Sequence, residues 1–164
     1  MKFDVVVEVG EGCSVKYEIN KDTGEIRVDR FLHTSFVYPF NYGFIKNTKG
    51  KDHDPLDAIV VSTHTVEAGA VIKCHAVGML QMKDEEGIDT KIVAVPIKKI
   101  DPENGKIEDI KDVPEATLSK IKHFFDHMKE LEPNKWVKTG DYKSRTEAEK
   151  IITECLLELT SDKS

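Results

Sequence analysis

The sequence predicts an α+β protein that is mainly β, in which a small barrel of strands carries helices on its outside. Short β-rich runs fill the first two-thirds of the chain, and apolar residues change to helical spacing in the last third. Strands first and helices last are typical of α+β proteins. Because 164 residues are enough for one core, we expect residues 1–164 to form a single domain.

Six segments have the composition or alternation of strands. They are residues 3–9, 15–19, 25–31, 56–61, 70–82 and 90–97. A cluster of turn residues at 20–24 separates the second segment from the third. The stretch 84–87 predicts a hairpin loop between the last two.

Two amphipathic helices are expected near the end of the chain. Apolar residues recur at positions 118, 121, 125 and 128, behind a start signal formed by Asp112 and Glu115. A second series at positions 148, 152, 155 and 159 follows a capping box made by Ser144 and Glu147.

Composition excludes several classes of function. A formal net charge of −6 disfavours non-specific nucleic-acid binding, which needs clustered Lys and Arg. The three cysteines are far apart and form no C-x-x-C pair, so we expect reduced thiols. Asp4 and Glu8 interrupt the N-terminal valines, and no run approaches the roughly 18 apolar residues of a membrane span. We therefore expect a cytoplasmic protein with neither membrane nor nucleic acid as a partner.

The densest chemical signal is the acidic segment that contains Asp52, Asp54 and Asp57. Three carboxylates so close together repel one another unless a cation is present. In an extended segment, Asp52 and Asp54 would face the same side, and a turn after Pro55 could bring Asp57 to them. Oxygen-only ligands favour hard cations such as Mg²⁺, Mn²⁺ or Ca²⁺. Taken alone, the segment fits a solvated acidic turn equally well.

A second acidic group consists of Asp84 and Asp89, followed by Lys91 on a predicted strand. Asp89 and Lys91 are two residues apart and would share one face of that strand. Read alone, the residues around Asp84 are more typical of a solvated hairpin tip.

A third group is cationic and phenolic. Lys16 and Glu18 alternate onto one strand face, and the planar guanidinium of Arg30 suits phosphate oxygens. Tyr38 and Tyr42 follow. Cross-strand ion pairs and packed tyrosines would explain each segment by itself. Clustered aspartates together with separate Lys, Arg and Tyr donors are, however, what metal-assisted phosphoryl transfer to water requires.

These motifs together resemble the soluble family I inorganic pyrophosphatases of bacterial type, from about residue 3 to the end of the second helix. Six motifs match in order: Val15-Lys16-Tyr17-Glu18, Val28-Asp29-Arg30-Phe31, Tyr38-Pro39-x-x-Tyr42-Gly43, Asp52-x-Asp54-Pro55-Leu56-Asp57, Asp84-x-x-Gly87-x-Asp89-x-Lys91 and Lys122-His123-Phe124-Phe125. The resemblance implies an OB-type five-stranded barrel with two flanking helices. It also implies a homohexamer that hydrolyses inorganic pyrophosphate to two phosphates, using several Mg²⁺ ions and a metal-activated water.

The resemblance also implies roles for individual residues. Asp54 matches the general base, and Asp89 is expected in the catalytic group as well as among the metal ligands. The metal ligands it implies are Asp52, Asp57, Asp84 and Asp89, with Glu8 and Glu18 beside them in the wider shell. The phosphate contacts it implies are Lys16, Arg30 and Tyr42, with Lys91 and Lys129 beside them, and Tyr38 belongs to the same shell.

Two positions depart from the family, and a pair of histidines that matches it carries a further expectation. His53 stands where the family usually has a small or polar residue, commonly glycine, and a positive φ there would cost histidine a modest penalty. Met128 replaces a tyrosine that contacts phosphate, so we expect weakened substrate binding. His123 and His127 have the i, i+4 spacing of zinc ligands but lack the accompanying glutamate. The matching pair in the family lies at the trimer contact, which predicts dissociation in acid.

Two other functions remain open from the sequence. One is a catalytically weakened relative that binds metal, suggested by His53 and Met128. The other is an OB-fold module that binds single-stranded nucleic acid and stacks bases on Tyr17, Tyr38 and Tyr42.

Overall fold

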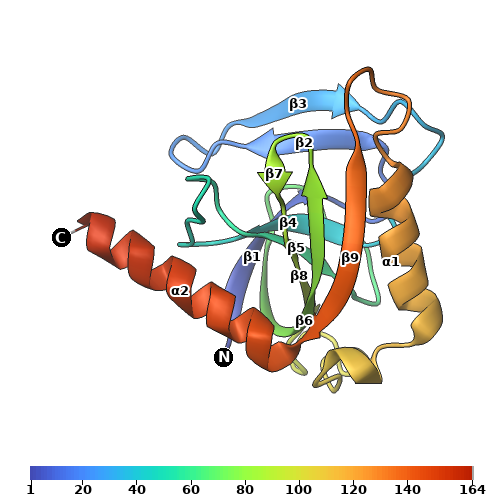
Figure 1. Cartoon of the computed structure of the whole chain (residues 1–164). Helices are drawn as coiled ribbons and strands as arrows, with labels where there is room; N and C mark the ends of the chain where they lie inside the picture. The colour runs from blue at the N-terminus through green and yellow to red at the C-terminus, as the bar shows by residue number, and fades with distance from the viewer. Residues whose placement is uncertain (164) are drawn as a thin grey trace.

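The computed structural model describes the backbone of residues 1–163 and the side chains of residues 1–156. Five strands form a closed barrel (Figure 1): β1 (Phe3–Val9), β4 (Asn41–Ile45), β5 (Asp57–Val60), β8 (Lys91–Pro96) and β6 (Val71–Asp84). Each pairs with the next in that order, and β6 pairs back with β1. Only the β5–β8 pair is parallel. The OB-type five-stranded barrel is therefore confirmed.

A two-stranded sheet lies across one end of the barrel (Figure 1). It consists of β2 (Val15–Ile19) and β3 (Ile26–Phe31), which pair antiparallel. Two further strands pair with the C-terminal half of the long strand β6. Strand β7 (Gly87–Ile88) forms a hairpin with the end of β6, and β9 (Val137–Ser144) pairs with residues 78–84 of β6. The predicted hairpin at 84–87 is thus confirmed.

The helices flank the barrel as expected. A short 3₁₀ helix, η1 (Ile110–Asp112), precedes α1 (Glu115–His127), and α2 (Arg145–Lys163) follows β9. Helix α1 buries Ile121, Phe124 and Phe125 in one apolar cluster, and α2 buries Ala148 and Ile152 in another. Position 159 of the predicted apolar series lies outside the described side chains. No helix in the described part of the chain combines the length and hydropathy needed to cross a bilayer.

One of the two helix start signals is wrong. Helix α1 is capped by Pro114 without a side-chain hydrogen bond, and Asp112 instead belongs to the capping box of η1. The second signal is confirmed, because the Glu147 amide donates to Ser144 Oγ at 3.3 Å and the Ser144 amide donates to the Glu147 carboxylate at 3.4 Å.

All six predicted strand segments are strands, with ends that differ by up to two residues. Strands β4, β7 and β9 were not predicted. Strand β4 contains a glycine within five residues, and β9 is rich in Lys, Thr and Gly, so neither has a strong alternating pattern. The apolar side chains of Ile26 and Val28 on β3 are exposed.

Candidate active site

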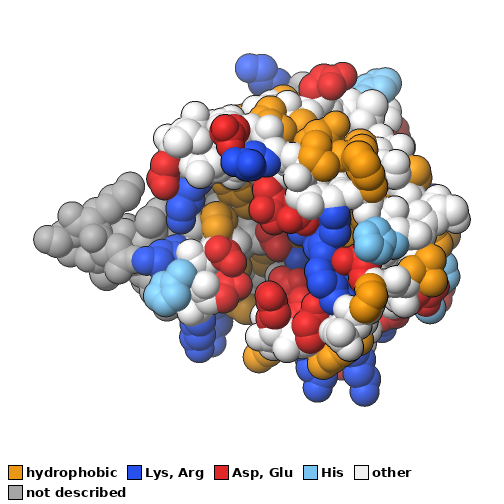
Figure 2. Space-filling model, turned by 90° about the horizontal axis from the view of Figure 1, so that it is seen from above, with side chains coloured by type: hydrophobic (Ala, Val, Ile, Leu, Met, Phe, Trp, Pro, Cys, Tyr) orange, Lys and Arg blue, Asp and Glu red, His pale blue; other side chains and the backbone are white. Residues whose placement is uncertain are grey.

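A cavity of about 1220 Å³ opens at the end of the barrel that β2 and β3 cross. Figure 2 shows it as a hollow in which acidic and basic side chains gather. Every predicted site residue lines this cavity: Glu8, Lys16, Glu18, Arg30, Tyr42, Asp52, Asp54, Asp57, Asp84, Asp89, Lys91 and Lys129. Residues from seven strands, from two loops and from the segment directly after α1 therefore converge on one space.

Lys91 organises the centre of the cavity. It pairs with Asp57 across the parallel β5–β8 ladder, and its Nζ donates to Asp57 Oδ2 at 2.8 Å and to Tyr42 Oη at 2.8 Å. Asp89 Oδ2 lies 3.0 Å from the same nitrogen. Burial lowers the pKa of Lys91, but the Asp57 and Asp89 carboxylates outweigh burial and raise it, so the ammonium stays charged at neutral pH.

Tyr42 and Tyr38 are buried beneath these charges. Tyr42 retains 5% of its surface and Tyr38 1%. Burial, reinforced by the Asp57 carboxylate, raises the pKa of Tyr42 well above its ordinary value. The phenol is therefore a neutral hydroxyl, which suits it to donate to an anion.

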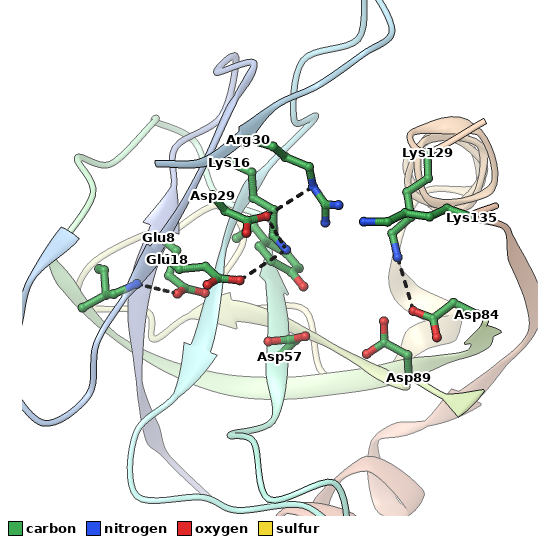
Figure 3. A network of polar contacts seen from close by, with 12 residues as sticks. Glu8, Lys16, Glu18, Asp29, Arg30, Asp57, Asp84, Asp89, Lys129 and Lys135 are labelled. Carbon is green, nitrogen blue, oxygen red and sulfur yellow. Dashed lines mark hydrogen bonds and ion pairs between the residues drawn. The ribbon is translucent and has the colours of Figure 1, made fainter. Parts of the chain in front are cut away.

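Asp84 forms a second acidic point at the β6–β7 hairpin. Its Oδ2 lies 3.3 Å from Lys129 Nζ, which comes from the residue after the C-cap of α1. Its Oδ1 accepts from the Glu86 amide at 2.9 Å. The side chain is thus fixed by both the hairpin and the helix end, and it points toward the carboxylate of Asp89 (Figure 3).

Residues 52–54 form a turn at the rim rather than an extended strand, whereas Asp57 begins β5. The Gly50 amide donates to the Asp54 carbonyl at 2.8 Å, and Asp52 Oδ1 accepts from the Asp54 amide at 3.0 Å. Residue alternation therefore does not place Asp52 and Asp54 side by side, which corrects that expectation. His53 has φ of 68°, so the position does require a left-handed backbone.

The sheet β2–β3 supplies cations on the opposite side (Figure 3). Lys16 and Arg30 are register partners, and Asp29 lies 3.6 Å from Lys16 Nζ and 3.2 Å from Arg30 Nε. The Lys16–Asp29 contact is therefore an ion pair between the two strands, whereas Lys16 and Glu18 lie 3.8 Å apart within β2 itself. They orient the cations into the cavity instead of replacing a functional role.

Glu8 lies on the β1 side of the cavity and accepts from the Ile19 amide at 2.9 Å. Burial raises the pKa of Glu8 to about 7, the hydrogen bond from Ile19 opposes the shift, and the Asp57 carboxylate adds to it. A carboxyl in this state gains charge when a cation approaches. Glu8 lies among the acidic side chains that line the cavity.

Sequence reasoning missed two residues that belong to this region. Lys135 lines the cavity, and Glu132 contacts both Lys135 and Arg30. Both lie in the segment between α1 and β9, where only turn residues at Pro133 and Asn134 gave a signal.

The donor set of the cavity suits a hard divalent cation. The candidate ligands Asp52, Asp57, Asp84 and Asp89 are all carboxylates, which are the ligands that Mg²⁺ prefers. Among the side chains described, no three acidic, imidazole or thiol groups already surround a single point. Lys91 and Lys129 instead provide the counter-charges.

Comparison with known proteins agrees with this geometry. The sequence profile described as inorganic pyrophosphatase matches residues 5–160. The inorganic pyrophosphatase of Aquifex pyrophilus is 51% identical over 144 residues, which cover 88% of this chain and 81% of that protein. The chain belongs to the inorganic pyrophosphatase family. The Sulfolobus acidocaldarius enzyme is 52% identical over 149 residues, covering 91% of this chain and 86% of the relative.

Solved pyrophosphatases have the same fold. The structure of the Helicobacter pylori enzyme superposes with a TM-score of 0.94 at 44% identity, covering 97% of this chain and 94% of the other. The Thermus thermophilus enzyme gives a TM-score of 0.93 at 38% identity, with 97% and 91% coverage. The family I resemblance seen in the sequence is thereby confirmed.

The nucleic-acid alternative is not favoured. Base stacking needs exposed aromatic faces, whereas Tyr38 and Tyr42 are buried in the core beneath the acidic groups. The relatives are, moreover, pyrophosphatases.

Proposed function

We propose that this chain hydrolyses inorganic pyrophosphate to two phosphates with Mg²⁺ as its cofactor. The observation that carries the proposal is the single cavity in which Asp57, Asp84 and Asp89 lie opposite Lys16 and Arg30 (Figure 3). Membership of the inorganic pyrophosphatase family supports the same reaction.

The carboxylates would hold the metal. Asp57 accepts from Lys91 at Oδ2, and the carboxylates of Asp89 and Asp84 lie beyond it in the cavity. Asp52 would join them from the rim. Bound Mg²⁺ supplies neutralisation of the substrate oxygens and a more acidic water.

The cations and phenol would bind the two phosphoryl groups. Lys16, Arg30 and Lys129 present ammonium or guanidinium donors, which form short charge-assisted hydrogen bonds with phosphate. Tyr42 adds a neutral donor, and Lys91 holds Asp57 and Asp89 in place while facing the same space. These donors orient the phosphorus atom toward an attacking water.

Asp54 would accept the proton of that water. Its carboxylate lies at the solvent-exposed rim, where a proton can pass on to bulk water. No nucleophilic side chain is needed, so the reaction proceeds without a phosphoenzyme.

The test is phosphate release from pyrophosphate with Mg²⁺, with EDTA, and with Asp54→Asn. We expect rapid release with Mg²⁺, none with excess EDTA, and a kcat reduced roughly 10²- to 10⁴-fold in the variant, the range typical of a lost general base. Asp141→Asn, an exposed position on β9 outside the cavity, should leave kcat unchanged. Full activity in EDTA would contradict the proposal. Metal binding with negligible turnover would favour the weakened relative instead.

The assembly and location follow the family. We propose a homohexamer in the cytoplasm. Exposed apolar side chains at Val28 and Phe31 and the paired imidazoles of His123 and His127 offer surfaces for subunit contacts. The free thiols of Cys13 and Cys74 suit a reducing compartment.

A further inference from the structure

A buried glutamate that the reaction scheme does not use lies behind the cations of the cavity. Glu132 follows α1, and its side chain is only 5% exposed. Its Oε1 lies 2.9 Å from Arg30 Nη1 and 3.3 Å from Lys135 Nζ. Its Oε2 is buried and has no hydrogen-bond partner among the described residues. Burying a carboxylate costs free energy, and the two cations that Glu132 binds compensate for this cost.

The local backbone places lysines on both sides of this glutamate. The Glu132 amide donates to the Lys129 carbonyl at 2.9 Å, and the Lys135 amide donates to the Glu132 carbonyl at 3.4 Å. The segment therefore folds into two successive turns centred on Glu132. Lys129 and Lys135 both reach the cavity, and Figure 3 shows the end of Lys135 directed toward Arg30.

Arg30 and Lys135 would repel each other without an anion between them. Arg30 Nη1 donates to Glu132 Oε1 at 2.9 Å, whereas Nε lies 3.2 Å from Asp29 Oδ2 as an ion pair without a hydrogen bond among the described residues. Its Nη2 has no carboxylate partner in the described part of the chain, so it remains available to a phosphate oxygen. The Lys135 side chain is 36% exposed and lines the same cavity.

We propose that Glu132 is a positioning residue that holds Arg30 and Lys135 toward the substrate, and that Lys135 is an additional contact for a phosphoryl group. This inference rests on the proposed function. Glu132 joins the segment after α1 to strand β3 and thereby sets the distance between Arg30 and Lys135, which come from distant parts of the sequence.

Neutralising Glu132 has two opposite effects on KM for pyrophosphate, one through the charge of the cavity and one through the positions of Arg30 and Lys135. If Glu132 only screens the cations, Glu132→Gln makes the cavity more positive and lowers KM for pyrophosphate. If Glu132 positions them, the isosteric change lets Arg30 and Lys135 move apart, and KM rises. We expect a rise of about tenfold, as for one lost charge-assisted contact, with kcat changed by less than about threefold.

The experiment compares Glu132→Gln, Lys135→Met and the double variant in steady-state assays with Mg²⁺. Because the two side chains act as one unit, the double variant should resemble the single variants rather than show the roughly hundredfold loss expected of independent sites. Glu149→Gln removes the same charge from an ion pair with Arg145 outside the cavity and should leave KM unchanged.

A lowered or unchanged KM in Glu132→Gln, or multiplicative losses in the double variant, would overturn the proposal. If Glu132→Gln does not fold, Lys135→Met still tests the proposal, because Lys135 is partly exposed and its replacement should not prevent folding. An unchanged KM in Lys135→Met would show that Lys135 does not contact a phosphoryl group. Calorimetric binding of imidodiphosphate with Mg²⁺ should show the same rise in Kd. That measurement separates this inference from the proposed function, because it does not depend on turnover.

Discussion

The charges that surround Lys91 explain how a charged ammonium can be buried in the cavity. It is buried, yet two carboxylates and a phenol surround its ammonium within 3.1 Å. Removing such a cation would leave Asp57 and Asp89 facing each other uncompensated. Lys91 therefore allows two partly exposed carboxylates to lie close together in the cavity, where a substrate and its metal would bind.

Met128 stands where the family has a tyrosine, and this difference has a measurable consequence. It lines the cavity beside Lys129 and is 6% exposed, so it packs but cannot donate a hydrogen bond. In Met128→Tyr, the hydroxyl can extend into the cavity toward phosphate. We expect KM for pyrophosphate to fall about three- to tenfold, the value of one hydrogen bond to a charged group. Steady-state kinetics of both proteins measure this, and an unchanged KM would refute the idea that a phosphate donor is missing.

The sequence predicted which residues carry the chemistry, but it did not predict the contacts that these residues make. The aspartates, Lys16, Arg30 and Lys91 were identified because their residue types and motif spacing are specific. The turn at Asp52 and the partners of Glu132 were not, because hydrogen bonds within a loop and contacts 102 residues apart leave no local pattern.

Among the connecting segments, the loop after β8 depends on one buried carboxylate. Asp101 is 6% exposed and accepts from the Thr63 amide at 2.8 Å, Thr63 Oγ1 at 2.9 Å and Asn104 Nδ2 at 3.0 Å. Burial acts to raise the pKa of Asp101, but the hydrogen bonds from Asn104 and Thr63 outweigh burial and lower it to about 2. The ionised carboxylate thus ties this loop to the end of β5.

The Asp101 contacts predict a pH-dependent stability. A pKa that is lower in the folded chain than in the unfolded chain stabilises the fold above the ordinary value near 3.8, and this stabilisation is lost as the pH falls toward 2. Asp101→Asn should therefore cost about 2 kcal/mol at pH 7, and the difference from the parent should shrink between pH 4 and pH 2. Urea unfolding of parent, variant and the exposed control Asp141→Asn measures this. An equal cost at every pH would show that the charge is not responsible.

The elements themselves were predictable where their pattern was strong. The Ser144–Glu147 capping box marked α2 because it is a local device, and six strands followed from β-rich runs. Strand β9 was missed because its stability comes from pairing with β6 and from Asp126, which accepts from the Thr139 amide at 3.0 Å, rather than from its own composition.

For the whole molecule, the outer face of α1 predicts a response of the assembly to acid. The rings of His123 and His127 have centroids 4.5 Å apart, and His127 Nδ1 lies 2.9 Å from Glu130. Two imidazoles that both gain a proton at such a distance repel each other. If α1 forms a subunit contact in the proposed hexamer, lowering the pH from 7.5 to 5 should dissociate it.

Light scattering across this pH range measures the mass. Replacing both His123 and His127 by Gln should make the mass insensitive to pH, whereas His33→Gln, an exposed histidine outside α1, should not. A constant mass in the parent would count against a histidine-dependent contact.

Carboxylates from separate parts of the chain converge beside the cations of the cavity, where we expect them to hold divalent metal. Diffraction from crystals grown with Mn²⁺ in place of Mg²⁺ can locate this metal, because Mn²⁺ is identified by its anomalous scattering. Peaks within coordination distance of Asp57 and Asp89 are the predicted result. A cavity without a peak, while Mn²⁺ occupies only carboxylates elsewhere on the surface, would contradict it.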